Sequence, residues 1–275
     1  MESMTVCTYR IPVPGTKPVR IFQIADTHLA CADSLSDQEE KAIAEKQTAA
    51  WEQVRPGFPQ KYGEPFGKER QIPALQHYVN LMRRASAGDA VVMCGDIMDY
   101  VSGGNLRAAE NGIRECGKPF IAVCGNHEDP GDIPQGCLLS GMREPVQTLQ
   151  VGDFQIIGID DSRRTVTKAV ISSVGSLLSS GRKTVIAMHT PVMNAANHDI
   201  LTRAGAYYAL NYDGCPESTA EFIDLITDGA SPVVAVLTGH LHFGIVTPLR
   251  EGLYQYGVSQ GIAGNMNEFI LGGEA

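Results

Sequence analysis

Five of the seven histidines in this 275-residue chain lie close behind short apolar segments. Four of these histidines, together with several acidic residues, belong to four short motifs: Asp26-Thr27-His28, Gly95-Asp96-Ile97-Met98-Asp99, Gly125-Asn126-His127-Glu128 and Gly239-His240-Leu241-His242. His189 follows a fifth apolar segment on its own. Imidazole nitrogens and carboxylate oxygens are common ligands of Zn, Fe, Mn, Ni and Co ions in proteins. The pattern therefore predicts a metal site assembled from five loops.

The number of candidate ligands exceeds what one ion needs. Seven side chains offer an imidazole nitrogen, a carboxylate oxygen or an amide oxygen: Asp26, His28, Asp96, Asn126, His189, His240 and His242. A structural zinc ion takes about four ligands, whereas two ions that share a bridging carboxylate can use all seven. Two-metal sites hold their ions roughly 3.5–4 Å apart and clamp the attacking and leaving oxygens of a phosphoryl displacement. Because the set contains no cysteine, it favours hydrolysis over electron transfer.

Strand-like and helical segments alternate along the chain, which predicts an α/β protein. Six nearly apolar runs rich in valine and isoleucine are expected to form strands, at 19–25, 90–94, 120–124, 154–160, 184–188 and 233–238. Such runs are typical of sheets that are covered on both faces. Helices are expected at 37–54, where Ser36 is the start signal, and at 72–85, 105–115, 172–180 and 217–227. Hairpins are expected at 146–160 and 244–258. Because ligands gather beyond the carboxyl ends of strands in open α/β sheets, the motifs are expected to meet at one edge.

A single domain spanning residues 1–275 is expected, because no internal repeat, low-complexity tract or interdomain linker interrupts the pattern. Residues 55–70 contain three prolines and three glycines and are expected to form a surface insertion. Residues 194–216 are expected to form a second long loop. The first strand is expected only at residue 19.

The composition is that of a globular protein with an acidic surface. A formal net charge of −9 disfavours a nucleic-acid partner, because phosphate backbones are bound through basic surfaces. The seven cysteines are dispersed and form no Cys-x-x-Cys pair, which predicts reduced thiols and a cytoplasmic location. No segment has the apolar length of a signal peptide or a membrane span, so no membrane partner is expected. The sequence sets no oligomeric state.

The ordered set of motifs resembles the calcineurin-like metallophosphoesterase superfamily. Its five blocks are Asp-x-His, Gly-Asp-x-x-Asp, Gly-Asn-His-Glu, a lone histidine and Gly-His-x-His, and all occur in this order between Asp26 and His242. The resemblance implies a four-layer α-β-β-α sandwich with two central mixed sheets. It also implies an enzyme that hydrolyses a phosphoester with two divalent or mixed-valence transition metal ions, drawn from Mn, Fe, Zn, Ni and Co.

The resemblance further implies a role for each motif residue. One ion would be bound by Asp26, His28 and His242, and the other by Asn126, His189 and His240, with Asp96 bridging the two. A hydroxide that bridges the ions would be the nucleophile. His127 would protonate the leaving oxygen or stabilise charge on the phosphoryl group, and Asp99 would orient His127 through a hydrogen bond.

Two features narrow the substrate that the resemblance implies. Phosphoprotein phosphatases of this superfamily carry Arg-Gly after the second motif, and Tyr100 and Val101 stand there in this chain. The compact Gly-His-x-His ending and the His189-Thr190-Pro191 context are more similar to the bacterial phosphodiesterase branch. The expected substrate is therefore a small molecule that contains a phosphodiester. A phosphomonoesterase or nucleotidase is the alternative, and a non-catalytic metal-binding scaffold would be expected to lack His127 or several ligands.

Several residues outside the ligand set could have either a functional or a structural role. The substrate phosphate could be bound by an arginine, and the sequence does not choose among Arg163, Arg164 and Arg203. A nucleobase could stack on a loop tyrosine, but packing of the 194–216 loop is expected for Tyr207, Tyr208 and Tyr212. Local structural or turn roles are expected for Glu128, Asp160 and Asp161. Positions outside the site are expected for His77 and His198.

Overall fold

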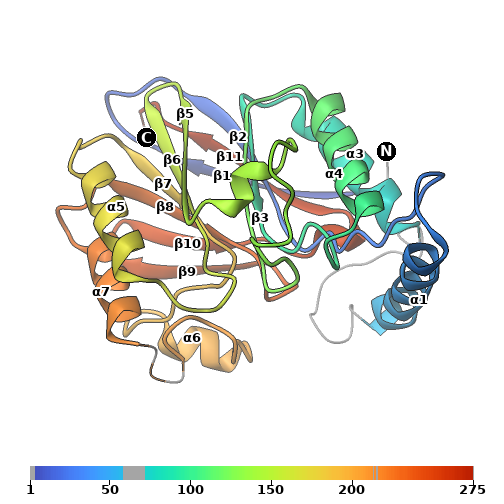
Figure 1. Ribbon diagram of the computed structural model, residues 1–275. Coiled ribbons are helices and arrows are strands. Elements are labelled where there is room, and N and C mark those ends of the chain that lie inside the picture. Colours follow the sequence, from blue (N-terminus) through green and yellow to red (C-terminus); the bar gives the residue numbers. More distant parts are fainter. Residues whose placement is uncertain (1–3, 58–71, 213, 215, 275) are drawn as a thin grey trace.

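Two β-sheets form the centre of the protein in a computed structural model that describes residues 4–57, 72–212, 214 and 216–274 (Figure 1). The first sheet contains, in spatial order, β1 (Thr5–Ile11), β11 (Asn265–Leu271), β2 (Val19–Ile24), β3 (Ala90–Cys94) and β4 (Phe120–Val123). The second contains β5 (Val146–Val151), β6 (Phe154–Ile159), β7 (Thr184–Ala187), β8 (Val233–Thr238), β10 (Leu253–Gly257) and β9 (Ile245–Arg250). Both sheets are mixed, because β11 is antiparallel to β2, and β5 and β9 are antiparallel to their neighbours.

Helices cover the outer face of each sheet, which gives four layers (Figure 1). The first sheet is covered by α3 (Ala74–Ala85) and α4 (Gly103–Cys116), and the second by α5 (Lys168–Leu178) and α7 (Glu217–Thr227). Two further helices, α1 (Gln38–Val54) and α6 (His198–Arg203), lie at the periphery. The predicted α-β-β-α sandwich with two mixed central sheets is therefore confirmed.

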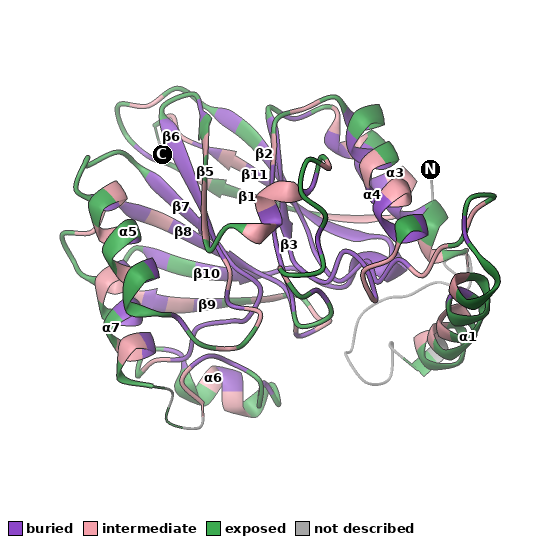
Figure 2. Cartoon of the chain, viewed as in Figure 1, coloured by how far each residue is buried: buried purple, intermediate pink, exposed green. Residues whose placement is uncertain are grey.

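Three buried apolar clusters correspond to the three interfaces between these layers. The strands between the helical layers are largely buried (Figure 2). Val91 of β3 packs with the helices of the first sheet, whereas its neighbour Val92 packs between the two sheets. Both faces of the strand are thus buried, which explains why all five of its residues are apolar. On the other side, Phe222 of α7 packs against Ile186 of β7. Each large apolar side chain buried in this way contributes roughly 1.5–3 kcal/mol to folding.

Local signals set several helix ends. The side chain of Asp37 accepts a hydrogen bond from the backbone N–H of Glu40 (2.8 Å), so Asp37 caps α1 and the predicted start signal at Ser36 is wrong by one residue. Ser102 caps α4, which ends at Gly117 with a left-handed φ of +64°. α1 is mostly exposed, and Ala44 is its buried residue (Figure 2).

Two strands of the first sheet were not predicted, and the expectation of a first strand at residue 19 is wrong. β1 lies at the edge and pairs in parallel with β11, which itself inserts between β1 and β2. β11 buries polar residues, among them Asn267, whose amide donates to Gln23 Oε1 (2.8 Å). Because β1 and β11 come from opposite ends of the chain and are partly polar, tertiary context and not local pattern makes them strands.

The two predicted insertions have different outcomes. The 194–216 segment was expected to be a loop but contains α6, which is stabilised because Leu201 is buried against Met193 and Leu241. In the 55–70 segment, Arg55–Gly57 form a 3-10 turn, and 58–70 lie outside the described residues. The other predicted strands and helices differ from the observed bounds by four residues or fewer. Among the helices of the described ranges, none has an apolar stretch that could cross a bilayer.

Candidate metal centre

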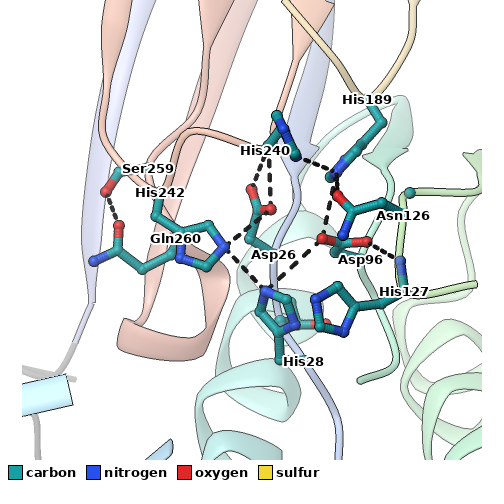
Figure 3. A network of polar contacts seen from close by, with 12 residues as sticks. Asp26, His28, Asp96, Asn126, His127, His189, His240, His242, Ser259 and Gln260 are labelled. Atoms are coloured by element: carbon teal, nitrogen blue, oxygen red, sulfur yellow. Dashed lines mark hydrogen bonds and ion pairs between the residues drawn. The ribbon is translucent and has the colours of Figure 1, made fainter. Parts of the chain in front are cut away.

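Loops that follow five strands bring the nine predicted site residues together. Eight of them, all but Asp99, are labelled in Figure 3. Each loop contributes one or two side chains, in chain order Asp26 and His28 after β2, Asp96 and Asp99 after β3, Asn126 and His127 after β4, His189 after β7, and His240 and His242 after β8. Three groups of potential metal ligands form there, and within each group the ligand atoms lie within 4.8 Å of one another. Both sheets therefore contribute to one site.

The first group consists of Asp26, His28 and His242. The Nε2 atoms of His28 and His242 lie 3.0 Å apart, and His242 Nε2 is 3.5 Å from Asp26 Oδ1. The Asp26 carboxylate also accepts the backbone N–H of His240, at 3.0 and 3.1 Å to its two oxygens, which fixes its orientation. Two imidazole nitrogens and one carboxylate oxygen thus face a common centre.

The second group consists of Asp96, His189 and His240, and Asn126 adds an amide oxygen. His189 Nε2 lies 3.3 Å from Asp96 Oδ2, 3.2 Å from Asn126 Oδ1 and 3.1 Å from His240 Nδ1. The other ring nitrogen of His189, Nδ1, donates to the backbone carbonyl of Cys94 (2.8 Å). This bond leaves Nε2 of the neutral ring as the potential ligand atom.

Asp96 lies between the two groups. Its Oδ1 accepts the backbone N–H of His127 (2.9 Å). Its Oδ2 is 3.3 Å from His189 Nε2 in one group and 4.0 Å from His28 Nε2 in the other. One carboxylate oxygen therefore faces both groups, which suits a ligand that bridges two ions through a single oxygen.

The spacing of these donor atoms fits two metal ions. Two ligand atoms bonded to one ion at about 2.0–2.1 Å, with angles of about 90–110°, are roughly 2.8–3.4 Å apart. The separations given above within each group run from 3.0 to 3.5 Å. Imidazole nitrogens also face each other in two pairs, at 3.0 and 3.1 Å. A cation between the lone pairs of such nitrogens stabilises this arrangement, and the nitrogen and oxygen donors suit transition metals.

In the second group, the charges of Asp96 and His189 shift each other's pKa. Burial acts to lower the pKa of His189, but the nearby carboxylates, Asp96 first and then Asp26 and Asp161, together raise this pKa to about 10. Burial acts to raise the pKa of Asp96, but His189 and His28 hold that pKa well below its usual range. Burial lowers the pKa of His240 to about 4. A cation bound to His189 has to displace its proton, so metal binding is expected to release protons.

The backbone of the motifs is strained. Within the described part of the chain, seven non-glycine residues have a left-handed φ, and five of them belong to the two groups: Asp26 (+53°), His28 (+41°), Asp96 (+51°), His240 (+71°) and His242 (+60°). Such conformations cost roughly 1–3 kcal/mol each and persist only where the surrounding structure enforces them. Their concentration here indicates that the loops are held in a shape that serves the site.

Two motif glycines allow the loops to approach closely. A Cβ atom at Gly125 would lie 2.1 Å from Asp96 Oδ1, and one at Gly239 would lie 2.9 Å from Asp26 Oδ2. Any side chain at either position would displace a carboxylate of the two groups. The glycines are thus required by the proximity of neighbouring loops.

His127 and Asp99 form a third group together with His28. His127 Nδ1–H donates to the backbone carbonyl of Asp99 (2.9 Å) and lies 3.2 Å from Asp99 Oδ1, so Nε2 is the ring nitrogen left for a substrate. The hydrogen bond with the Asp99 side chain raises the pKa of His127 to about 9, so the ring can carry a second proton at neutral pH. Bound cations would act on this pKa in the opposite direction.

Trp51 of α1 also belongs to the site and was not predicted. Its indole Nε1–H donates to Asp99 Oδ1 (2.9 Å), and its ring lies 4.3 Å from the His28 ring, measured between centroids. The same Asp99 oxygen is 3.3 Å from His28 Nδ1, so Trp51 supports both a candidate ligand and the orientation of His127. The chain has one tryptophan, but its place in a predicted helix does not show which loop the ring reaches.

We expect Trp51→Phe to lower kcat/KM by about 10-fold, because residues that orient metal ligands typically carry effects of that size. The phenyl ring keeps the packing against His28 but cannot donate to Asp99. Steady-state kinetics and thermal unfolding of the variant would measure the two effects separately. Gln53→Ala, on the exposed side of the same helix, is the matched control, and unchanged kinetics in Trp51→Phe would refute this role.

Two buried carboxylates hold the loops of the site in place. Glu128 accepts three backbone N–H groups, from Asp96 (2.9 Å), Met98 (2.8 Å) and Gly125 (2.8 Å), which is the local structural role expected of it. Burial raises the pKa of Glu128 to about 7, and the neighbouring Asp96 adds to the shift. The second and third motifs are thus tied together by one side chain.

Asp161 plays a larger role than the turn residue that was expected. Its carboxylate accepts the backbone N–H groups of His189 and Thr190, each at 2.7 Å, and burial raises its pKa to about 6. The residues are 28 positions apart in sequence, so spacing gave no signal of this contact. Asp160 has the expected turn role, because its Oδ1 accepts the N–H of Ser162 (3.1 Å).

A cleft of about 890 Å³ opens over the three groups. Its lining includes Asp96, Asn126 and His127 of the motifs and the aromatic side chains of Trp51, Tyr208 and Phe243. The remaining histidines are elsewhere, as expected: His77 is buried within α3, and His198 is exposed at the start of α6. The cleft is large enough for a small phosphorylated molecule.

Comparisons with known proteins agree with this geometry. A family model described as calcineurin-like phosphoesterase matches residues 19–244, which is most of the chain. The crystal structure of a dimetal phosphatase from Danio rerio has a similar fold, with a TM-score of 0.56 and 13% sequence identity over 90% of this chain and 89% of that chain. No curated protein matches the chain in sequence. The chain belongs to the calcineurin-like phosphoesterase family and is a metal-dependent phosphoester hydrolase.

Proposed function

We propose that this protein hydrolyses a phosphodiester in a small molecule with the help of two transition metal ions. The observation that carries this proposal is the position of Asp96. Its Oδ2 faces both groups of candidate ligands, at 3.3 Å from His189 Nε2 and 4.0 Å from His28 Nε2. A site for one ion would not need an oxygen shared between two groups.

Seven side chains are proposed to hold the ions. Asp26, His28 and His242 would bind one ion and Asn126, His189 and His240 the other, with Asp96 shared between them. When bound, the ions lower the pKa of water and neutralise negative charge on the phosphoryl group. The mixture of imidazole and oxygen donors suits Mn, Fe, Zn, Ni and Co.

His127 is proposed to protonate the leaving oxygen. Its Nδ1–H is held by Asp99, which leaves Nε2 in the cleft as the proton donor. Asp99 is itself held by the Trp51 indole N–H. General acids positioned in this way typically accelerate a reaction by about 10²–10⁴-fold.

A diester is proposed as the substrate in preference to a monoester. A phosphomonoester carries more charge on its phosphoryl group than a diester, and recognition of that charge favours an additional arginine. The position after the second motif, where the phosphoprotein phosphatases of the superfamily carry Arg-Gly, is occupied by Tyr100 and Val101. The sequence at this position thus supports the diester.

We expect removal of metal with a chelator to abolish hydrolysis of bis(p-nitrophenyl) phosphate, and added Mn²⁺, Co²⁺, Ni²⁺ or Zn²⁺ to restore it, because the donor set accepts each of these ions. The loaded protein should turn over this diester faster than p-nitrophenyl phosphate. Activity that survives chelation would contradict the proposed chemistry. Turnover of the monoester without the diester would instead reverse the substrate preference.

We further propose that residues 1–275 act as one domain in the cytoplasm, on a small phosphorylated substrate and not on nucleic acid. Site residues come from loops of both sheets, which supports a single functional unit. The seven dispersed cysteines support a reducing compartment, and the net charge of −9 disfavours binding to a phosphate backbone.

A further inference from the structure

The wall of the active-site cleft carries a permanent positive charge. Among the described residues that line the cleft, Arg164 is the one basic side chain other than the histidines, and it is half-buried. The lining of the cleft also includes apolar side chains, among them Val54, Leu241 and Phe243. A guanidinium group in such surroundings interacts with an anion more strongly than one in open solvent.

The backbone of Arg164 is tied to the loop of a candidate metal ligand. Arg164 lies between β6 and α5, has a left-handed φ of +57°, and donates its N–H to the carbonyl of Asp161 (2.7 Å). The carboxylate of the same Asp161 accepts the backbone N–H groups of His189 and Thr190. One tight turn therefore fixes the position of Arg164 relative to the second ligand group.

The side chain of Arg164 is placed by Tyr208. The guanidinium carbon lies over the Tyr208 ring, 5.6 Å from its centroid, within the range of a cation–π interaction. The Tyr208 ring also meets the His240 ring edge to face, at 5.7 Å between centroids. Tyr208 thus connects the arginine with a candidate ligand of the second group.

Of the three arginines that the sequence left open, Arg163 and Arg203 are not among the described residues that line the cleft. Arg163 is exposed and forms an ion pair with Asp129 at 3.5 Å. Arg203 of α6 donates its Nε–H to the backbone carbonyl of Asp199 (3.1 Å). Of the tyrosines, Tyr208 lines the cleft, whereas the ring of Tyr207 packs against Tyr212. The structure thereby selects one arginine and one tyrosine from the two sets.

We propose that Arg164 binds a charged oxygen of the substrate phosphoryl group, and that Tyr208 is a positioning residue that orients its guanidinium. This inference rests on the proposed hydrolysis of a phosphoester. The second motif supplies no arginine, because Tyr100 follows it, and Arg164 supplies that charge from a loop of the second sheet. A phosphoester anion is the ligand class, since guanidinium and phosphoryl oxygens match in charge and geometry.

The test compares steady-state kinetics of Mn²⁺-loaded wild type, Arg164→Ala, Arg164→Lys and Arg163→Ala on bis(p-nitrophenyl) phosphate. We expect Arg164→Ala to raise KM by about 10- to 100-fold, as expected for a lost hydrogen bond to a charged group, with a smaller change in kcat. Arg164→Lys should recover part of the loss, and Arg163→Ala should match wild type. The inhibition constant of inorganic phosphate should rise in parallel, while metal content stays unchanged.

Variants of Tyr208 test whether this residue acts by positioning Arg164. Tyr208→Leu should raise KM by about 2- to 5-fold, and Tyr208→Phe, which keeps the ring, should raise KM less than Tyr208→Leu does. The double variant Arg164→Ala/Tyr208→Leu should be no worse than Arg164→Ala, because Tyr208 acts through the arginine. Tyr207→Leu is the matched control. Additive effects would overturn the role of Tyr208.

Different results would contradict the proposed hydrolysis and the proposed role of Arg164. If wild type shows no metal-dependent hydrolysis, the proposed function is wrong. If wild type is active but Arg164→Ala and Arg164→Lys both retain the KM and the phosphate inhibition constant of wild type, only the role of Arg164 is overturned. Loss of metal in both variants would also overturn it, because the arginine would then be supporting the ligand loops.

Discussion

Replacing Asp96 with alanine is expected to remove both metal binding and turnover. The side chain offers Oδ2 to both ligand groups and accepts the His127 backbone N–H with Oδ1, so its loss disturbs three loops at once. We expect kcat/KM to fall by more than about 100-fold, which is the upper end of the effects of residues that only support ligands. Elemental analysis and kinetics of the same preparation would measure both losses.

A carboxylate outside the ligand groups is the control for this substitution. Asp129 follows the third motif closely in sequence, is exposed, and pairs with Arg163. Asp129→Ala should therefore keep two ions and wild-type kinetics. If Asp96→Ala still held two ions with wild-type affinity, Asp96 would not be a shared ligand.

His127→Ala, unlike Asp96→Ala, should retain both ions, while its turnover should fall by about 10²–10⁴-fold. The ring contacts Asp99 through Nδ1 and presents Nε2 to the cleft, so its removal takes away a proton donor without removing a proposed ligand. The loss should be larger for an alkyl leaving group than for p-nitrophenol, because a good leaving group departs without being protonated. Kinetics with one substrate of each kind would separate the two cases.

His198 offers a matched control for the second experiment. It is an exposed histidine at the start of α6 and contacts Asp199, so His198→Ala should behave like wild type. Two results would contradict the role of His127: a loss of bound metal in His127→Ala, or an equal loss of rate for good and poor leaving groups.

The fold could be predicted where local pattern determines structure. The buried strands β2, β3, β7 and β8 have both faces covered, so they are continuous apolar runs that the sequence displays directly. Their ends also marked the site, since the polar motif residues begin where the apolar runs stop. β1 and β11 could not be predicted, because they pair across nearly the whole chain and β11 buries polar residues such as Asn267.

The residues of the site likewise divide into those that the sequence could predict and those that it could not. Motif spacing identified the nine residues that the structure brings together, since short motifs at strand ends keep their members close in space. Trp51 and Asp161 had no such signal, because each reaches the site from an element with no motif of its own. The choice of Arg164 over Arg163 also needed the structure. Arg164 has a left-handed φ and lines the cleft, whereas the adjacent Arg163 does not line it, and the sequence does not show this difference.

Anomalous diffraction from crystals of protein loaded with saturating Mn²⁺ would test the central claim most directly. We expect two peaks roughly 3.5–4 Å apart, one beside Asp26 and His242 and one beside Asn126 and His240, with Asp96 touching both. A single peak, or peaks that Asp96 does not contact, would contradict a dinuclear centre built from these five loops.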